Sequence, residues 1–136
     1  EAGTQRVSQA VAFAAAVCYL QHLGMENVEA WEHELGARLV EGVQKIEGVR
    51  LLGPTDPTKR AGLVALAIEG VHPHDVGQLL DTQGIAVRVG HHCAQPLHRC
   101  AGVTASTRAS TYIYNTTEDV DAFLKALAEV RPYFGF

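Results

Sequence analysis

The chain has 136 residues, of which 47% are hydrophobic, enough to bury one ordinary core, and we predict a single domain over residues 1–136. Its formal net charge is −4 with only 11 lysines and arginines, so no basic surface for nucleic acid is expected. The longest strongly apolar run, residues 10–20, is shorter than the roughly 20 residues that a membrane-spanning helix needs, which argues against a membrane protein.

Three cysteines, Cys18, Cys93 and Cys100, make an odd number with irregular spacing. That pattern disfavours a disulfide framework and indicates free thiols in a reducing compartment, so we expect a cytoplasmic protein. The sequence begins Glu-Ala-Gly-Thr with no initiator methionine, which we interpret as the start of a piece of something longer.

Apolar residues spaced three and four apart predict a largely buried first helix over residues 5–23. Thr4 is the expected N-cap and Gly24 the expected stop. Cys18 lies in the apolar stripe of this helix, so we predict that it packs in the core.

A second helix with one apolar face is predicted from an Asn27 cap to Ile46. The remaining elements follow in chain order: strands at 49–52 and 62–68, a helix that begins at His-Pro-His-Asp (72–75), a strand at 85–89, a helical turn at 96–100, a strand at 106–114, and a last helix capped by residues 115–118. This order predicts an α/β fold, a two-layer α/β sandwich with a small sheet covered on one face.

The segment 88–96 reads R-V-G-H-H-C-A-Q-P and places Cys93 directly after His91 and His92. A thiol flanked by imidazoles is either a nucleophile or a metal ligand, and His98 and Cys100 add two further possible ligands. Neighbouring residues of an extended loop point to opposite sides, which disfavours a metal site, and a polar loop disfavours a buried structural thiol. We therefore favour Cys93 as a nucleophile supported by His91 and His92, with no metal bound.

A nucleophile needs a substrate clamp, and two arginines on predicted strands are candidates. Arg88 precedes the cysteine loop, and Arg108 shares one face of the strand 106–114 with Ser110, opposite Thr107 and Ala109. An arginine fork binds a carboxylate with two hydrogen bonds, although each arginine is also compatible with an ordinary solvated strand position.

Several strings of this sequence together resemble the C-terminal part of the group II, SUF-type cysteine desulfurases of the class V aminotransferase superfamily. They are R-V-G-H-H-C-A-Q-P-L at 88–97, T-R-A-S at 107–110 with its arginine fifteen residues after the cysteine, Y-N-T at 114–116, H-P-H-D at 72–75 and G-I-A-V-R at 84–88. The resemblance runs nearly end to end. It implies the small C-terminal domain of a fold-type I, pyridoxal-phosphate-dependent homodimer that moves sulfur from L-cysteine onto a cysteine as a persulfide, releases L-alanine and supplies iron–sulfur cluster assembly.

The resemblance also implies roles for single residues. Cys93 matches the persulfide-forming nucleophile, Arg108 the arginine that binds the substrate carboxylate, and Arg88 a second active-site arginine. Thr4 resembles a residue that reaches the cofactor phosphate of the partner subunit, or it is only a helix cap. His74 resembles the histidine that enters the zinc shell of a scaffold-like SUF sulfur acceptor, or it is only a residue of a helix's first turn.

One departure limits the resemblance. Family members hold the cofactor on a lysine in a Ser-x-His-Lys-type segment of a large domain, and Lys45, Lys59 and Lys125 lie in no such motif. We therefore expect pyridoxal phosphate in the full-length enzyme and none on this chain, which alone is expected to be inactive, with residues 1–24 as the helix that links to the large domain. The alternatives are a selenocysteine lyase domain and a non-catalytic sulfur-relay or metal-binding module.

Overall fold

A computed structural model describes residues 3–136 of the chain, which divide into two units, one ending at Trp31 and one spanning Glu32–Phe136. Ten further elements follow helix α1 (Val7–Leu23): α2 (Met25–Val43), β1 (Val49–Leu52), the 3-10 turn η1 (Pro57–Lys59), β2 (Leu63–Ile68), α3 (Pro73–Thr82), β3 (Arg88–Gly90), α4 (Gln95–Cys100), β4 (Ser106–Ser110), α5 (Thr117–Ala128) and α6 (Val130–Tyr133). The predicted order of helices and strands is confirmed, with the short helix α6 and the turn η1 added.

Helix α1 differs from the prediction in its burial. All of its residues are described and none is buried; Phe13 is 72% exposed, and Cys18 is exposed as well. The predicted burial of this helix, and of Cys18 with it, is therefore wrong for this chain. Apolar spacing shows that a helix has a face suited to burial, but the surface that covers the face has to come from elsewhere.

The start of α1 also differs from the prediction. The N-cap is Arg6, with no side-chain cap, because the Val7 amide donates to the Gln5 carbonyl (2.9 Å) and turns the chain at Arg6. Thr4 lies two residues before this position and is exposed, so its predicted role as a cap is wrong. Among the described residues, no single helix is long and apolar enough to cross a membrane, although α1 and α2 taken as a bent pair pass on length and composition.

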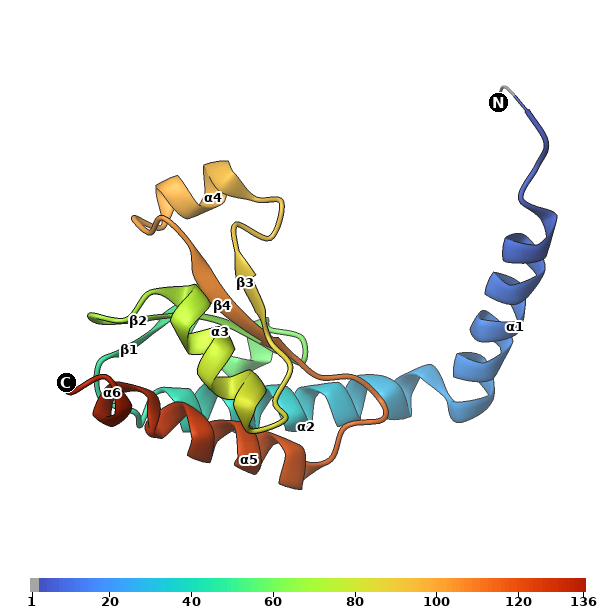
Figure 1. Ribbon diagram of the computed structural model, residues 1–136. Coiled ribbons are helices and arrows are strands. Elements are labelled where there is room, and N and C mark those ends of the chain that lie inside the picture. Colours follow the sequence, from blue (N-terminus) through green and yellow to red (C-terminus); the bar gives the residue numbers. More distant parts are fainter. Residues whose placement is uncertain (1–2) are drawn as a thin grey trace. The chain divides into compact units, whose positions relative to one another are not determined.

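The second unit is built on a four-stranded antiparallel sheet in the order β1-β2-β4-β3. Helices α2 and α5 run side by side on one face of it, and α3 packs on β3 and β4 (Figure 1). Alternate strand residues face these helices, as a half-covered sheet requires: Val64, Leu66 and Ile68 are buried, and so are Thr107 and Ala109. The two-layer α/β fold is thus confirmed.

The helices complete the core with apolar side chains that are 4% exposed or less. These are Leu35, Leu39, Val40 and Val43 of α2, Val76 and Leu80 of α3, Val120, Phe123, Ala126 and Leu127 of α5, and Val130 of α6. Gly42 allows the close approach of α2 and α5, since a Cβ there would lie 2.2 Å from the Leu124 side chain. A bidentate ion pair between Arg38 and Asp121 (2.6 and 2.7 Å) joins the same two helices at the surface.

Several predicted boundaries shift, and α2 begins at Met25, so Asn27 lies inside the helix and is not its cap. Helix α2 ends at Val43, before the predicted Ile46, and β3 begins at Arg88 rather than at residue 85. Strand β4 ends at Ser110 rather than at residue 114, because the Asn115 side chain accepts a hydrogen bond from the Tyr112 amide (2.9 Å) and closes a turn.

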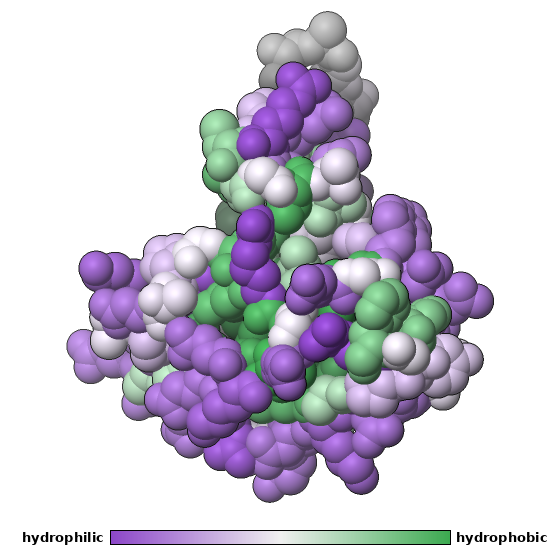
Figure 2. All heavy atoms as spheres, turned by 90° about the vertical axis from the view of Figure 1, so that its left-hand side faces the viewer, coloured by the Kyte–Doolittle hydropathy of each residue, from purple (hydrophilic) through white to green (hydrophobic). Residues whose placement is uncertain are grey.

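Figure 2 shows one face of the molecule, where hydrophilic side chains surround an apolar area.

Candidate active site

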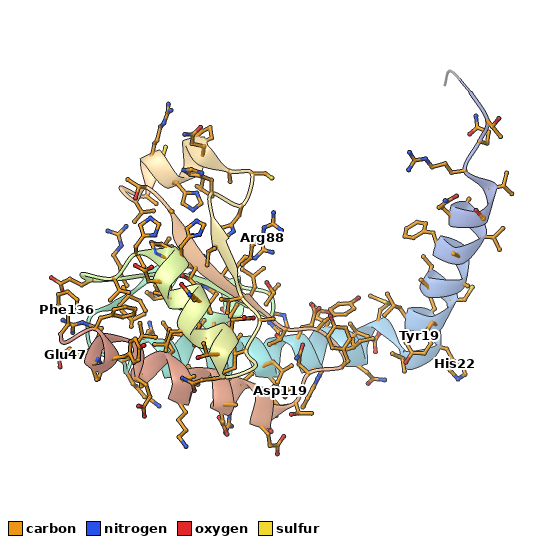
Figure 3. All side chains as sticks on the ribbon, viewed as in Figure 1. Tyr19, His22, Glu47, Arg88, Asp119 and Phe136 are labelled. Carbon is orange, nitrogen blue, oxygen red and sulfur yellow. The ribbon has the colours of Figure 1, made fainter. Side chains whose placement is uncertain are left out.

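Two candidate site residues, Arg88 and Arg108, lie on the sheet face opposite α3. Cross-strand partners share a face, so the register Arg88–Arg108–Ala65 across β3, β4 and β2 places both arginines on it. Arg50 of β1, opposite Ala67, lies there too. We call this surface the open face; Arg88 extends from it into solvent (Figure 3). The predicted division of β4 into two faces is confirmed.

The two candidate clamp arginines are directly opposite each other in the β3–β4 register. Like charges in such a position destabilise a sheet unless an anion lies between or beside them. The Arg108 Nε atom is buried and has no hydrogen-bond acceptor among the described residues. Arg50 differs, because its Nη2 donates to the Ala101 carbonyl. On the open face, the Arg108 Nε–H is therefore a donor without an acceptor among the described residues.

Cys93 lies on a tight turn that follows β3. His92 and Cys93 have positive φ angles of 51° and 59°, and the Ala94 amide donates to the His91 carbonyl (2.8 Å). Two consecutive non-glycine residues in the left-handed region cost about 1–2 kcal/mol each, and such strain persists only where the surrounding structure enforces it. The turn leaves the Cys93 side chain exposed.

Beyond the turn, α4 folds over the end of the open face and covers Ser106. His98 is 6% exposed and Ser106 is fully buried. The Ser106 hydroxyl lies 2.9 Å from His98 Nε2 and 2.9 Å from His92 Nε2, and His98 Nδ1 lies 3.0 Å from the Ala94 carbonyl oxygen. His91 is exposed, with its ring edge-on to His98 at 5.7 Å. The two predicted supporting histidines thus differ from each other: His92 contacts Ser106, whereas His91 is exposed.

His92 is partly buried in a positively charged setting. Burial is the main cause that lowers its pKa, followed by the charges of Arg108, His98 and Arg88. The neutral imidazole is therefore favoured. Its Nδ1 atom is buried and has no hydrogen-bond partner in the part of the chain that the structure describes.

His74 is exposed in the first turn of α3, where His72 is the N-cap and Pro73 follows, as predicted. The His72 and His74 rings stack at 5.3 Å. The Thr107 hydroxyl donates to the Pro73 carbonyl (3.4 Å). This hydrogen bond connects the start of α3 to β4 at the residue next to both Ser106 and Arg108. Thr4 belongs to the other unit and is exposed.

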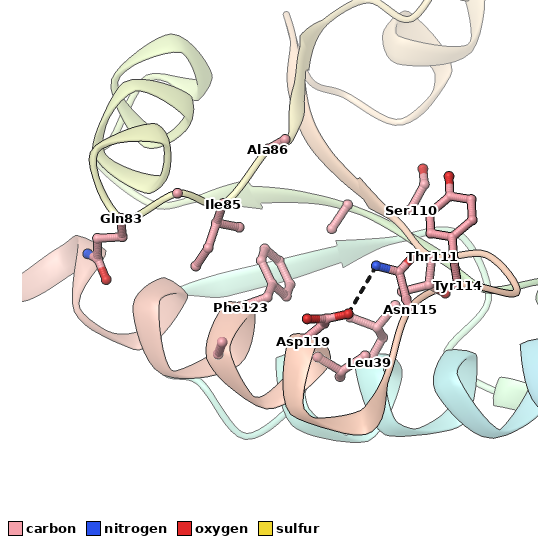
Figure 4. Close-up of a pocket in the computed structure, with 14 residues that line it drawn as sticks. Leu39, Gln83, Ile85, Ala86, Ser110, Thr111, Tyr114, Asn115, Asp119 and Phe123 are labelled. Carbon is pink, nitrogen blue, oxygen red and sulfur yellow. Dashed lines mark hydrogen bonds between the residues drawn. The ribbon is translucent and has the colours of Figure 1, made fainter.

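A cavity lies elsewhere in the second unit. It has a volume of about 490 Å³ and is lined by Leu39, Ile85, Ser110 and Phe123 among others, with an Asn115–Asp119 hydrogen bond at one side (Figure 4). A smaller hollow of about 190 Å³ touches His91 and His98 but not Cys93. Within residues 3–136, no group of three or more His, Cys, Asp or Glu side chains is arranged to hold a metal ion.

Sequence reasoning identified Cys93, Arg88 and Arg108; the structure sets the two arginines opposite each other on the open face and places Cys93 on the turn that follows β3. It considered His98 only as a possible metal ligand and did not identify Ser106 or Arg50. Ser106 shares strand parity with Arg108, but nothing in the sequence indicates that a loop would fold over it.

Together these residues form a two-layer α/β domain that carries an exposed thiol on a strained turn beside a basic sheet face. Residues 1–123 match the Aminotransferase class-V family, and the chain belongs to that family. It is 49% identical over 135 residues to the probable cysteine desulfurase 2 of Mycobacterium leprae and 48% identical to a probable cysteine desulfurase of Halalkalibacterium halodurans. These matches cover 99% of this chain and 32% of each relative, so the chain spans about a third of their length.

Solved structures agree. The apo cysteine desulfurase of Thermococcus onnurineus superposes with a TM-score of 0.90 at 40% identity over 96% of this chain and 32% of that one. The cysteine desulfurase CsdA (S-sulfonic acid) of Escherichia coli superposes with a TM-score of 0.88 at 34% identity, over 98% of this chain and 32% of that one. The resemblance to cysteine desulfurases drawn from the sequence motifs is thereby confirmed.

Proposed function

We propose that the chain supplies half of the active site of a cysteine desulfurase. Cys93 accepts sulfur from L-cysteine, and Arg108 with Arg88 binds the substrate carboxylate. The observation that carries this proposal is the buried Arg108 Nε that lacks an acceptor beside a second, directly opposed arginine. A carboxylate offers two oxygens to a guanidinium and removes both the repulsion and the unmet donor.

The turn supports the role of Cys93. An exposed thiol at the tip of a tight turn is accessible both to a substrate and to a protein that later takes the sulfur. In the reaction, the Cys93 sulfur forms a bond to the substrate sulfur while the carbon–sulfur bond of the substrate breaks. The products are a persulfide on Cys93 and L-alanine, so no external oxidant or reductant is consumed.

The cofactor in this proposal is pyridoxal phosphate, which when bound withdraws electrons from the substrate and makes its carbon–sulfur bond cleavable. The residues present here do not form a site for it. Lys45 follows α2, Lys59 lies in η1 and ion-pairs with Asp56 (3.8 Å), and Lys125 lies in α5, so none shares an element with the site. Residues outside the chain would hold the cofactor, and Thr4 is proposed to reach the cofactor phosphate of a partner subunit in a homodimer.

The proposed sulfur acceptor is a zinc-containing, scaffold-like protein of a SUF system. His74 is its proposed contact, because it is exposed and lies at the end of α3 that is tied to β4. The turn carrying Cys93 is short, so the acceptor has to come to the cysteine. We place this reaction in the cytoplasm, where the three cysteines stay free thiols.

The test uses the full-length protein that carries this chain, incubated with L-cysteine. We expect alanine and a persulfide on Cys93, both lost in Cys93→Ala and both retained in Cys100→Ala, the matched control at another exposed cysteine. Persulfide on Cys100 or activity in Cys93→Ala would overturn the proposal. Release of selenide from L-selenocysteine by Cys93→Ala, with no sulfur release by the parent protein, would favour a selenocysteine lyase.

A second test concerns the cofactor and uses the 136-residue chain. We expect no cofactor absorbance after incubation with pyridoxal phosphate and gel filtration. Borohydride reduction that fixes the cofactor on Lys45, Lys59 or Lys125 would contradict the assignment of the cofactor site to residues outside the chain.

A further inference from the structure

Three side chains on both sides of Cys93 form one hydrogen-bonded chain that ends on the backbone of the turn. It runs from the Ala94 carbonyl through His98 and Ser106 to His92, with each contact between 2.9 and 3.0 Å. His92 precedes the cysteine and Ala94 follows it, so the chain anchors the residue on each side of Cys93.

For neutral imidazole rings, the chemistry of these groups sets the direction of every hydrogen bond. A carbonyl oxygen only accepts, so His98 Nδ1 carries a hydrogen and donates to Ala94. In the neutral form of His98 the ring hydrogen lies on Nδ1, so Nε2 carries none and accepts. The single Ser106 hydroxyl hydrogen is then donated to His98, and the Ser106 oxygen accepts from His92 Nε2.

His92 is thereby held as the Nε2–H tautomer, with an unprotonated Nδ1. That atom is buried and has no partner among residues 3–136, and the neighbouring arginine charges favour the same neutral ring. The left-handed pair His92–Cys93 needs an enforcing structure, and the same hydrogen bonds tie the turn to the fully buried Ser106 of β4.

We propose that Ser106 and His98 are positioning residues that hold His92 in one tautomer and hold the turn that presents Cys93. The assignment rests on the proposed function only in its consequence for sulfur transfer. The tautomers and the turn geometry follow from the hydrogen bonds themselves.

The direct test is NMR of the isotopically labelled 136-residue chain, with long-range proton–nitrogen correlations that distinguish imidazole tautomers. We expect His98 as the Nδ1–H form and His92 as the Nε2–H form, while the exposed His22 averages between both. A His98 ring protonated at Nε2 alone, or a His92 ring that averages as His22 does, would overturn the proposal without any variant.

Variants of Ser106 separate positioning from general structural support. In Ser106→Ala we expect His92 to average between tautomers while His98 keeps its hydrogen on Nδ1, because the Ala94 carbonyl still accepts it. Ser106→Thr keeps the hydroxyl and should restore the single His92 tautomer. A fixed Nε2–H tautomer of His92 in Ser106→Ala would contradict the proposal.

In the full-length protein, Ser106→Ala should slow persulfide formation on Cys93 about tenfold with the KM for L-cysteine changed less than about twofold, since misplacing the attacking sulfur affects the chemical step. Ser106→Thr should recover most of the rate, and an unchanged rate in Ser106→Ala would refute the role in sulfur transfer. If the full-length protein forms no persulfide at all, the proposed function fails while the tautomer assignment stands on its own measurement.

Discussion

Replacing Arg108 with methionine should stabilise the isolated chain, although it removes the proposed substrate clamp. Methionine keeps most of the apolar stem and removes the guanidinium, whose Nε is buried without an acceptor in residues 3–136. It also removes the like-charge pair with Arg88, directly opposite in the β3–β4 register. A residue kept for binding rather than for folding is expected to show this sign.

The magnitude follows from the two contributions. A buried polar group without a partner costs about 1–3 kcal/mol, and a cross-strand like-charge pair costs up to about 1 kcal/mol. Arg108 is only partly buried, so water solvates part of its guanidinium and the lower end applies. We expect Arg108→Met to raise the free energy of unfolding by about 1 kcal/mol, a rise of about 0.5 M in the urea midpoint.

The assay is urea unfolding of the 136-residue chain followed by far-ultraviolet circular dichroism. Arg50→Met is the matched control on the same open face, because its guanidinium donates to the Ala101 carbonyl. This control should lose about 0.5–1.5 kcal/mol. If Arg108→Met lowers the midpoint, or if both variants shift it in the same direction, the inference of an unmet acceptor at Arg108 is refuted.

Three further predictions concern the scaffold and the turn. Gly77→Ala should lower the melting temperature despite alanine's higher helix propensity, because its Cβ would lie 2.8 Å from Val89 on β3; a higher melting temperature would contradict this packing. Burial, followed by the neighbouring arginine charge, lowers the pKa of His92. As the pH falls, the unfolded chain therefore takes up a proton on His92 before the folded chain does. The contribution of this group to the free energy of unfolding is complete above about pH 6.5 and is lost as the pH falls below it. Urea midpoints at pH 7.5 and 5.5 should therefore differ less in His92→Gln than in the parent, and equal differences would refute the assignment. Thr116→Ala breaks the capping box with Asp119 (3.3 and 2.9 Å) and should cost about 1 kcal/mol in thermal unfolding, whereas Thr116→Ser should cost little.

Local sequence patterns were enough to predict the order of the helices and strands and several of their bounds. Strand β1 and the start of α3 at Pro73 were predicted at their observed positions, because apolar periodicity and capping residues act within a few residues of each other. The parity of β4 was also predictable, since alternation alone assigns Thr107 and Arg108 to opposite faces.

The candidate site was predictable only in part. A cysteine next to two histidines and two strand arginines stand out by residue type, and the fold sets Arg88 opposite Arg108 and places Cys93 on the turn after β3. The errors on the burial of α1 and of Cys18 have one cause. A helix's apolar stripe predicts that it can be buried, whereas actual burial depends on a covering surface that this stretch of sequence does not describe.

The surroundings of the cysteine depend on contacts between elements that are distant in the sequence. The antiparallel register set Arg88 against Arg108, and α4 folded back over β4 and joined His98, Ser106 and His92 across up to fourteen residues of sequence. Such contacts depend on how the chain is bent between the elements, and no local pattern records that bend. The motif therefore identified the nucleophile, and the fold determined how it is held.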